Sequence, residues 1–231
     1  MWRFIVVLFI TGAACLGAKS DSPVGTWATQ IAGKDQGVCY LTFSNNFTMA
    51  GYGIAVDALG PFQISGAWNL DAHGRLVGGL TQFVGGGGFG AKFHGSANHN
   101  KLRALVNSTA GFFNFHGAPA GSIPDVSGEW LGEVRQPGQK FFVTYNAVLS
   151  SNTPAWFDLT DQGVNNTGTF TVTGGMLVMP DRRVAAYTIS DFGTSTETDA
   201  FIGTIAAKGK RLILHGHSSD NKPVVIRAAR P

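Results

Sequence analysis

Short runs in which apolar and polar residues alternate follow one another along most of the chain, and this pattern predicts β-strands. In the run Thr169-Phe170-Thr171-Val172-Thr173, Phe170 and Val172 face one side of a strand and the threonines face the other. Outside the N-terminal leader, no window shows the sustained period of about three to four residues that marks an amphipathic helix. The pattern therefore predicts an all-β protein whose sheet has one buried face and one wet face.

Turn residues divide the chain at intervals of roughly 8–12 residues, so about eight strands are expected in each half. In the first half the expected strands centre on residues 26–32, 37–43, 47–56, 61–70, 75–83, 90–97, 101–107 and 111–116. In the second half they centre on residues 129–135, 140–149, 155–160, 168–178, 183–190, 199–206, 210–217 and 223–229.

The two halves align with each other. Residues 60–66 (GPFQISG) match residues 168–174 (GTFTVTG) at an offset of 108 residues, and the same offset brings residues 93–96 onto residues 201–204. Upstream, the Gly-X-Trp motif that ends at Trp27 pairs with Gly128-Glu129-Trp130 at a slightly shorter offset. The chain therefore contains two tandem copies of one β-meander.

These observations divide the chain into four parts. We expect a signal peptide at residues 1–18, a first β-meander at residues 19–118, a linker at residues 119–127 and a second β-meander at residues 128–231. The linker is placed where Gly, Pro and Ala dominate the sequence.

The N-terminal segment has the pattern of an export signal, with a short positive start, an apolar run and a small-residue tail. Cleavage is expected after Ala18, which makes the protein secreted, periplasmic or attached to the cell envelope and leaves no transmembrane span. An alternative interpretation makes Cys15 a lipidated N-terminus. Once the leader is removed, Cys39 is the remaining cysteine, and its apolar neighbours predict a buried thiol.

Eight consecutive antiparallel strands leave two exposed edges unless the sheet closes, so each half is expected to form an up-and-down barrel. The motifs Gly25-Thr26-Trp27 and Gly128-Glu129-Trp130, each followed by such a meander, resemble the calycin plan of lipocalins and avidins. The resemblance implies that Trp27 and Trp130 are structural residues that close one end of each barrel. One larger closed sheet built from both halves is the alternative to two barrels.

Composition narrows the range of functions. The 231 residues are 44% hydrophobic and 13% charged, and they include 32 glycines. Disordered chains are more highly charged, and nucleic-acid-binding domains carry stronger positive fields than the formal charge of +3 found here. Neither a disordered chain nor a nucleic-acid partner is therefore expected.

Candidate chemistry is sparse. Glu129 and Glu133 share a strand face but stand about 13 Å apart at roughly 3.3 Å per residue, too far for the usual carboxylate pair of a glycosidase. His215 and His217 share a face, as two metal ligands would, but the sequence nominates no third ligand. The run Gly85–Gly88 predicts a hairpin loop rather than a phosphate cradle. No catalytic residue, metal site or cofactor is predicted.

The leading hypothesis is an exported, non-catalytic binding module for a small apolar or sugar-like ligand. A structural protein of the cell envelope without a ligand is the second hypothesis, and a hydrolase that uses Glu129, Glu133 or His215 is the third. A transmembrane barrel of sixteen strands is the alternative at the level of the fold. The oligomeric state is not indicated by the sequence.

Overall fold

The computed structural model describes residues 21–58, 60–84, 87–165, 168–206 and 208–231. The predicted signal peptide at residues 1–18, with its cleavage after Ala18 and the alternative lipidation of Cys15, lies outside the described residues. Within these ranges we find no helix long and apolar enough to cross a membrane.

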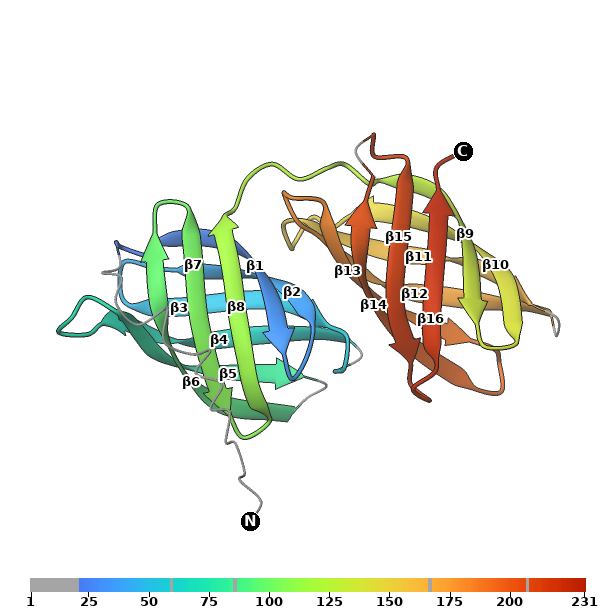
Figure 1. Ribbon diagram of the computed structural model, residues 1–231. Helices are drawn as coiled ribbons and strands as arrows, with labels where there is room; N and C mark the ends of the chain where they lie inside the picture. The colour runs from blue at the N-terminus through green and yellow to red at the C-terminus, as the bar shows by residue number, and fades with distance from the viewer. Residues whose placement is uncertain (1–20, 59, 85–86, 166–167, 207) are drawn as a thin grey trace, which may run out of the picture.

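The described residues form sixteen β-strands in two groups of eight (Figure 1). The first group consists of β1 (Gly25–Gly33), β2 (Gly37–Phe43), β3 (Thr48–Ala55), β4 (Gly60–Leu70), β5 (Leu76–Val84), β6 (Gly87–Asn98), β7 (Lys101–Ser108) and β8 (Gly111–Pro119). The second consists of β9 (Gly128–Gln136), β10 (Gln139–Leu149), β11 (Trp156–Asn165), β12 (Gly168–Val178), β13 (Arg183–Asp191), β14 (Thr196–Ile205), β15 (Arg211–Ser218) and β16 (Pro223–Ala229).

Each group closes on itself as an antiparallel up-and-down barrel. Every strand pairs with its neighbours in sequence, β1 pairs with β8 to close the first barrel, and β16 pairs with β9 to close the second. The chain crosses from β8 to β9 as an extended segment that bridges the two barrels (Figure 1). The prediction of two tandem eight-stranded barrels is confirmed, and the alternative of one larger closed sheet is wrong.

The expected strands all occur, and the largest difference lies at the end of one of them. The strand predicted at residues 155–160 extends to Asn165 as β11, because the inward position of Gly163 leaves room for the ring of Phe170. A Cβ atom at Gly163 would lie 2.2 Å from Cζ of Phe170. The predicted glycine loop is shorter than expected, because Gly87 and Gly88 already belong to β6.

Inward-facing glycines at equivalent positions explain part of the internal repeat. Gly66 and Gly174 lie on the fourth strand of their barrels, and a Cβ atom there would lie 2.3 Å and 2.1 Å from a carbonyl oxygen of the neighbouring strand. Gly95 and Gly203 lie on the sixth strands, and the corresponding distance is 1.9 Å at both. Neighbouring strands therefore approach closely at these points, as at the corners of a small barrel, and a side chain would hold them apart.

The interiors of both barrels are filled with side chains. Large residues such as Trp27, Phe62 and Phe93 pack in the first barrel, and Trp130, Phe157 and Phe201 pack in the second. Cys39 is fully buried in the first core, as its apolar neighbours predict, and burial raises the pKa of its thiol well above the ordinary value. The second barrel encloses a cavity of about 20 Å³ lined mainly by apolar side chains.

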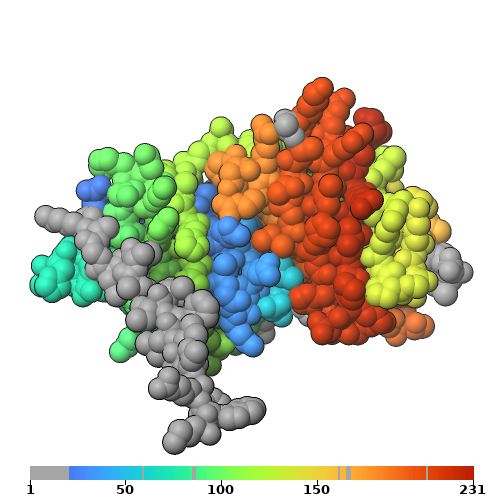
Figure 2. All heavy atoms as spheres, in the orientation of Figure 1, coloured from blue at the N-terminus to red at the C-terminus, as the bar shows by residue number. Residues whose placement is uncertain are grey.

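The outer faces of the two barrels also pack against each other, through β2, β3 and β4 of the first and β12 and β13 of the second. The shared apolar cluster consists of Ala28, Val38, Tyr40, Ile54, Ala155, Leu177, Met179 and Ala185. Figure 2 shows the blue N-terminal strands in contact with the orange strands of the second barrel. The hydroxyl of Tyr40 donates across this interface to the carbonyl oxygen of Val178 at 2.9 Å.

Candidate ligand-binding site

A row of side chains runs around the outside of the first barrel from the buried interface towards solvent. Tyr40 on β2 stands opposite Tyr52 on β3, Tyr52 opposite Gln63 on β4, and Gln63 opposite Phe83 on β5. Directly opposite residues of an antiparallel pair project from the same face, so all four point outward. Tyr40 is buried and Phe83 is 47% exposed, so the outer end of the row is open to a ligand.

Two contacts hold Tyr52 in place within this row. Its ring stacks on that of Tyr40, with centroids 5.7 Å apart and an interplanar angle of 21°. Its hydroxyl donates to the carbonyl oxygen of Pro154, in the second barrel, at 2.7 Å. Partial burial raises the pKa of Tyr52 to about 12, so the hydroxyl remains a donor at neutral pH. The ring of Tyr52 is therefore fixed at the junction of the barrels.

Trp156, at the start of β11, faces this row from the second barrel. Its indole lies directly on Gly175, where a Cβ atom would come within 2.3 Å of Cζ2, and its ring centroid is 6.1 Å from that of Tyr187. The indole N–H donates to Oδ1 of Asp158 at 3.0 Å. Because three neighbours determine its position, Trp156 presents a preformed aromatic surface.

Together these residues line a groove of about 390 Å³ between the barrels, whose walls are formed by Tyr52, Pro61, Phe62, Gln63, Phe83, Thr153 and Trp156. Pockets that hold small molecules usually measure about 300–1,000 Å³, are mostly apolar with a few polar groups, and often occur at domain interfaces. The groove has this size, composition and position.

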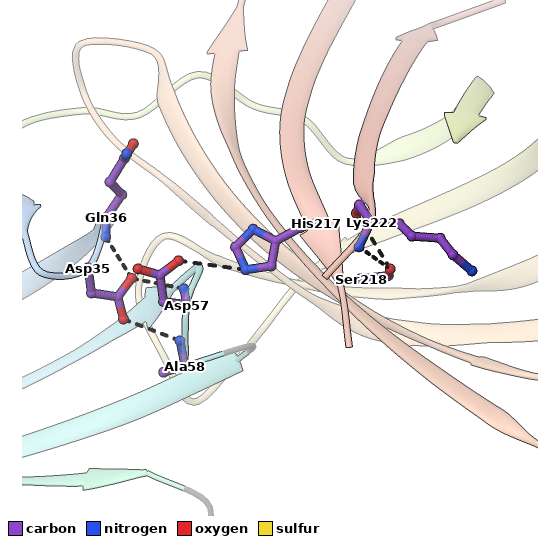
Figure 3. Close-up of polar contacts among 7 residues, drawn as sticks. All are labelled: Asp35, Gln36, Asp57, Ala58, His217, Ser218 and Lys222. Carbon is purple, nitrogen blue, oxygen red and sulfur yellow. Dashed lines mark hydrogen bonds and ion pairs between the residues drawn. The ribbon is translucent and has the colours of Figure 1, made fainter. Parts of the chain in front are cut away.

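A second set of polar contacts joins the barrels beyond the groove (Figure 3). Nε2 of His217, on β15, lies 3.6 Å from Oδ1 of Asp57 in the first barrel. The loop that carries Asp57 is held by Asp35, whose carboxylate accepts the backbone N–H groups of Gln36, Asp57 and Ala58. Burial raises the pKa of Asp35 although these N–H groups favour its ionised form. These contacts help to fix one barrel relative to the other.

A wider depression of about 780 Å³ lies on the outside of the first barrel, over β4 to β7. Its walls consist of glycines and short or flexible polar residues, among them Ser65, Thr81, Lys92 and Asn107, together with Leu80 and Ala91. It contains no aromatic ring among its described residues, so it offers less apolar contact to a ligand than the groove between the barrels.

The two predicted barrel-end residues are both buried on the first strands of their barrels. The indole N–H of Trp27 donates to the carbonyl oxygen of Pro23 at 2.7 Å, and that of Trp130 donates to Val126 at 2.9 Å. The guanidinium carbon of Arg230 lies 4.9 Å from the ring centroid of Trp130. Neither tryptophan belongs to the groove, and their predicted role in closing the barrel ends remains a prediction.

The residues weighed for catalysis do not gather into a site. Glu129 is exposed on β9. Glu133 forms ion pairs with Lys140, at 2.8 Å, and with Arg135, and these two cations hold the pKa of the Glu133 carboxyl below its usual value. His215 is exposed on β15. Across the ranges that the structure describes, no group of three or more His, Cys, Asp or Glu side chains is placed to hold a metal ion.

The adjacent residues Trp156 and Phe157 face opposite ways, as alternation along a strand requires. Phe157 is buried in the second core and Trp156 lines the groove. Tyr52, Gln63 and Phe83 were not found, because they carry no local motif and come together only through strand register and the packing of one barrel on the other.

Comparisons with known proteins add little. No protein-family model matches the chain, and no curated protein matches it. A search of solved structures finds a protein of unknown function from the DUF3598 family of Nostoc punctiforme, 13% identical, with 90% of this chain and 96% of that chain covered and a TM-score of 0.29. This likeness is too weak to support a functional argument.

Proposed function

We propose that this protein is an exported, non-catalytic binding module that holds a sugar-like ligand in the groove between its two barrels. The observation that carries the proposal is the preformed aromatic lining, in which Tyr52 and Trp156 approach the same space from different barrels. The pattern of residues 1–18 supports export.

The barrel interiors are less suitable places for a ligand of this size. The first barrel is packed with apolar side chains, and the 20 Å³ cavity of the second has room for little more than one water molecule. Trp27 and Trp130 fit a role as structural plugs at the barrel ends, as in the calycin plan, and this role is part of the proposal. The groove is the volume that a ligand of several rings would fill.

The lining favours a sugar over a purely apolar ligand. The apolar C–H face of a pyranose ring packs on an aromatic ring, while its hydroxyls need donors and acceptors at the edge. Tyr52, Phe83 and Trp156 supply the rings, and Gln63 and Thr153 supply polar groups on both sides of the groove. Gln63 can both donate and accept, which suits a hydroxyl.

Isothermal titration of the full chain with maltohexaose, cellohexaose and chitohexaose tests the proposal, with 1-anilinonaphthalene-8-sulfonate as an apolar probe. We expect saturable binding of at least one hexasaccharide and an approximately 30-fold loss of affinity in Trp156→Ala, since truncating a central aromatic anchor costs about 2 kcal/mol.

Phe112→Ala is the matched control, because Phe112 is an exposed ring (59%) outside the groove. Its affinity should equal that of the unmodified protein. If only the apolar probe binds, the ligand of the groove is apolar and not a sugar. If neither the hexasaccharides nor the apolar probe bind, a structural role in the cell envelope is favoured. Equal loss in both variants would place the ligand elsewhere.

A further inference from the structure

Three exposed apolar side chains lie together on the outside of the second barrel. Phe142 on β10 stands directly opposite Val164 on β11, and Leu131 on β9 lies diagonally across the ladder from Phe142. Phe142, Val164 and Leu131 are 62%, 58% and 52% exposed. Strands β9 and β10 lie on the side of the second barrel that is turned away from the first barrel (Figure 1). We call these three residues the outer apolar face.

The strand registers show which residues of the first barrel are equivalent to the outer apolar face. The comparison starts from Trp27 and Trp130 on the first strands and follows the paired residues across to β3 and β11. It makes Gly53 equivalent to Gly163, and a Cβ atom at these glycines would lie 2.4 Å and 2.2 Å from Cζ of a phenylalanine on the next strand. The equivalents of Leu131, Phe142 and Val164 are Ala28, Val38 and Ile54.

These three residues of the first barrel form part of the interface between the barrels. Ala28, Val38 and Ile54 belong to the shared apolar cluster, and they are 5%, 0% and 0% exposed. The first barrel therefore uses this part of its outer surface to bind a neighbouring barrel. In the second barrel the equivalent positions are also apolar, although no described residue buries them. An exposed apolar cluster at the equivalent of an existing interface indicates a second docking surface.

The first barrel of another molecule does not offer a matching surface. The shared apolar cluster includes Leu177 and Met179 of the second barrel. At the repeat offset of 108 residues, their equivalents in the first barrel are Asn69 and Asp71. Burying these polar side chains under an apolar face is costly, so barrels of successive molecules are not expected to join head to tail. The apolar surface that does match is the outer apolar face of a second molecule.

Charges of both signs border the outer apolar face. Nζ of Lys140 lies 5.3 Å from the ring centroid of Phe142 and 2.8 Å from the carboxylate of Glu133. Arg227 on β16 stands directly opposite Glu133 on β9. An apolar centre with a polar rim is the usual anatomy of a protein interface. Because a two-fold axis brings the same patch of both molecules together, cations of one rim can pair with acids of the other.

We propose that this protein forms a two-fold symmetric dimer in which the outer apolar faces of two molecules pack against each other. Such a dimer leaves the groove of each molecule open, because no residue of the outer apolar face lines the groove. The inference therefore does not depend on the proposed function. Because the apolar centre consists of three side chains on each molecule, we expect a reversible dimer with a dissociation constant in the micromolar range.

Sedimentation equilibrium of the full chain, from low micromolar to submillimolar concentration, tests the inference. The mass should rise with concentration to that of two chains and no further. Phe142→Asp should weaken dimerisation at least about 30-fold, because a symmetric dimer loses two aromatic anchors and gains two like charges near its axis.

Phe112→Asp is the matched control, because Phe112 is a similarly exposed ring (59%) on β8 of the first barrel. Its dissociation constant should equal that of the unmodified protein. The inference is overturned if the unmodified chain stays monomeric, if both variants dimerise equally well, or if species larger than a dimer form. A monomer that sediments with phosphatidylglycerol vesicles, and loses this in Phe142→Asp, would make the face a membrane contact instead. Circular dichroism of Phe142→Asp confirms that a loss of dimerisation does not arise from unfolding.

Discussion

Replacing Gly95 with alanine should destabilise the first barrel strongly, although both residues are small. Gly95 lies on β6 and faces inward, and a Cβ atom there would lie 1.9 Å from the carbonyl oxygen of Arg103 and 2.7 Å from Cα of Ala104. Ordinary contacts between a carbon and a carbonyl oxygen are about 3.3–3.6 Å long. Strands β6 and β7 would therefore have to separate by roughly 1 Å or more at this corner.

The expected cost follows from what this separation breaks. A ladder hydrogen bond that lengthens from about 2.9 Å by 1 Å is lost, at about 1 kcal/mol for each bond. Overpacking adds about 1–3 kcal/mol. The total is about 3 kcal/mol, and at roughly 2–4 °C per kcal/mol for a chain of this size, the melting temperature should fall by about 6–12 °C.

Gly90→Ala is the control on the same strand, because a Cβ atom at Gly90 meets nothing within 4 Å. It should leave the melting temperature unchanged or raise it slightly. Thermal unfolding followed by circular dichroism compares the two, and Gly203→Ala should reproduce the loss in the second barrel. If Gly95→Ala melts within about 2 °C of Gly90→Ala, close strand approach is not the reason for the glycine.

Three further predictions concern the interface, the groove and the buried acid. Tyr40→Phe removes the hydrogen bond to Val178 and should lower the free energy of unfolding in urea by about 1–2 kcal/mol; no loss would show that this bond contributes nothing to joining the barrels. Gly175→Ala should push the indole of Trp156 from its place and weaken hexasaccharide binding at least tenfold in calorimetry, whereas unchanged affinity would contradict a preformed surface. Burial and two acidic neighbours raise the pKa of Asp199 from 3.8 to about 7 in the folded protein, so the folded state binds this proton more tightly than the unfolded state. The resulting contribution to the free energy of unfolding is fully present below about pH 4 and is lost as the pH rises to about 7. Asp199→Asn should remove this pH dependence and raise the free energy of unfolding at pH 8, measured in urea, by at most about 4 kcal/mol. If the stability of the variant changes with pH as steeply as that of the unmodified protein, another group causes the pH dependence.

The fold was largely predictable because its information is local. Alternation and turn residues located the strands, and the offset between Phe62 and Phe170 revealed the repeat. The closure of the first barrel was harder to predict than its strands, because the pairing of Trp27 with Pro119 joins the two ends of a meander and depends on how far the sheet coils. The continuation of β11 past Thr160 was missed because the polar residues that follow are typical of a turn, whereas Gly163 in fact accommodates Phe170.

The candidate site was less predictable because it arises from packing between distant segments. Tyr52 and Phe83 belong to one outward row only through the register of three strands, and that row becomes a groove only beside Trp156. Asp199 resembles any polar strand residue until its inward parity and its buried neighbours are known. Comparison of the repeats is the sequence signal that singles it out, since Ala91 occupies the equivalent position.

The central claim is that the ligand occupies the groove and not a barrel interior. The indole N–H signals in a ¹H–¹⁵N NMR spectrum test it directly, because Trp27, Trp68 and Trp130 are buried at other places whereas Trp156 lines the groove. On saturation with the hexasaccharide that binds, the account predicts a shift of the Trp156 signal while those of the three buried tryptophans stay in place. Shifts of Trp27 or Trp130 with an unchanged Trp156 signal would contradict it.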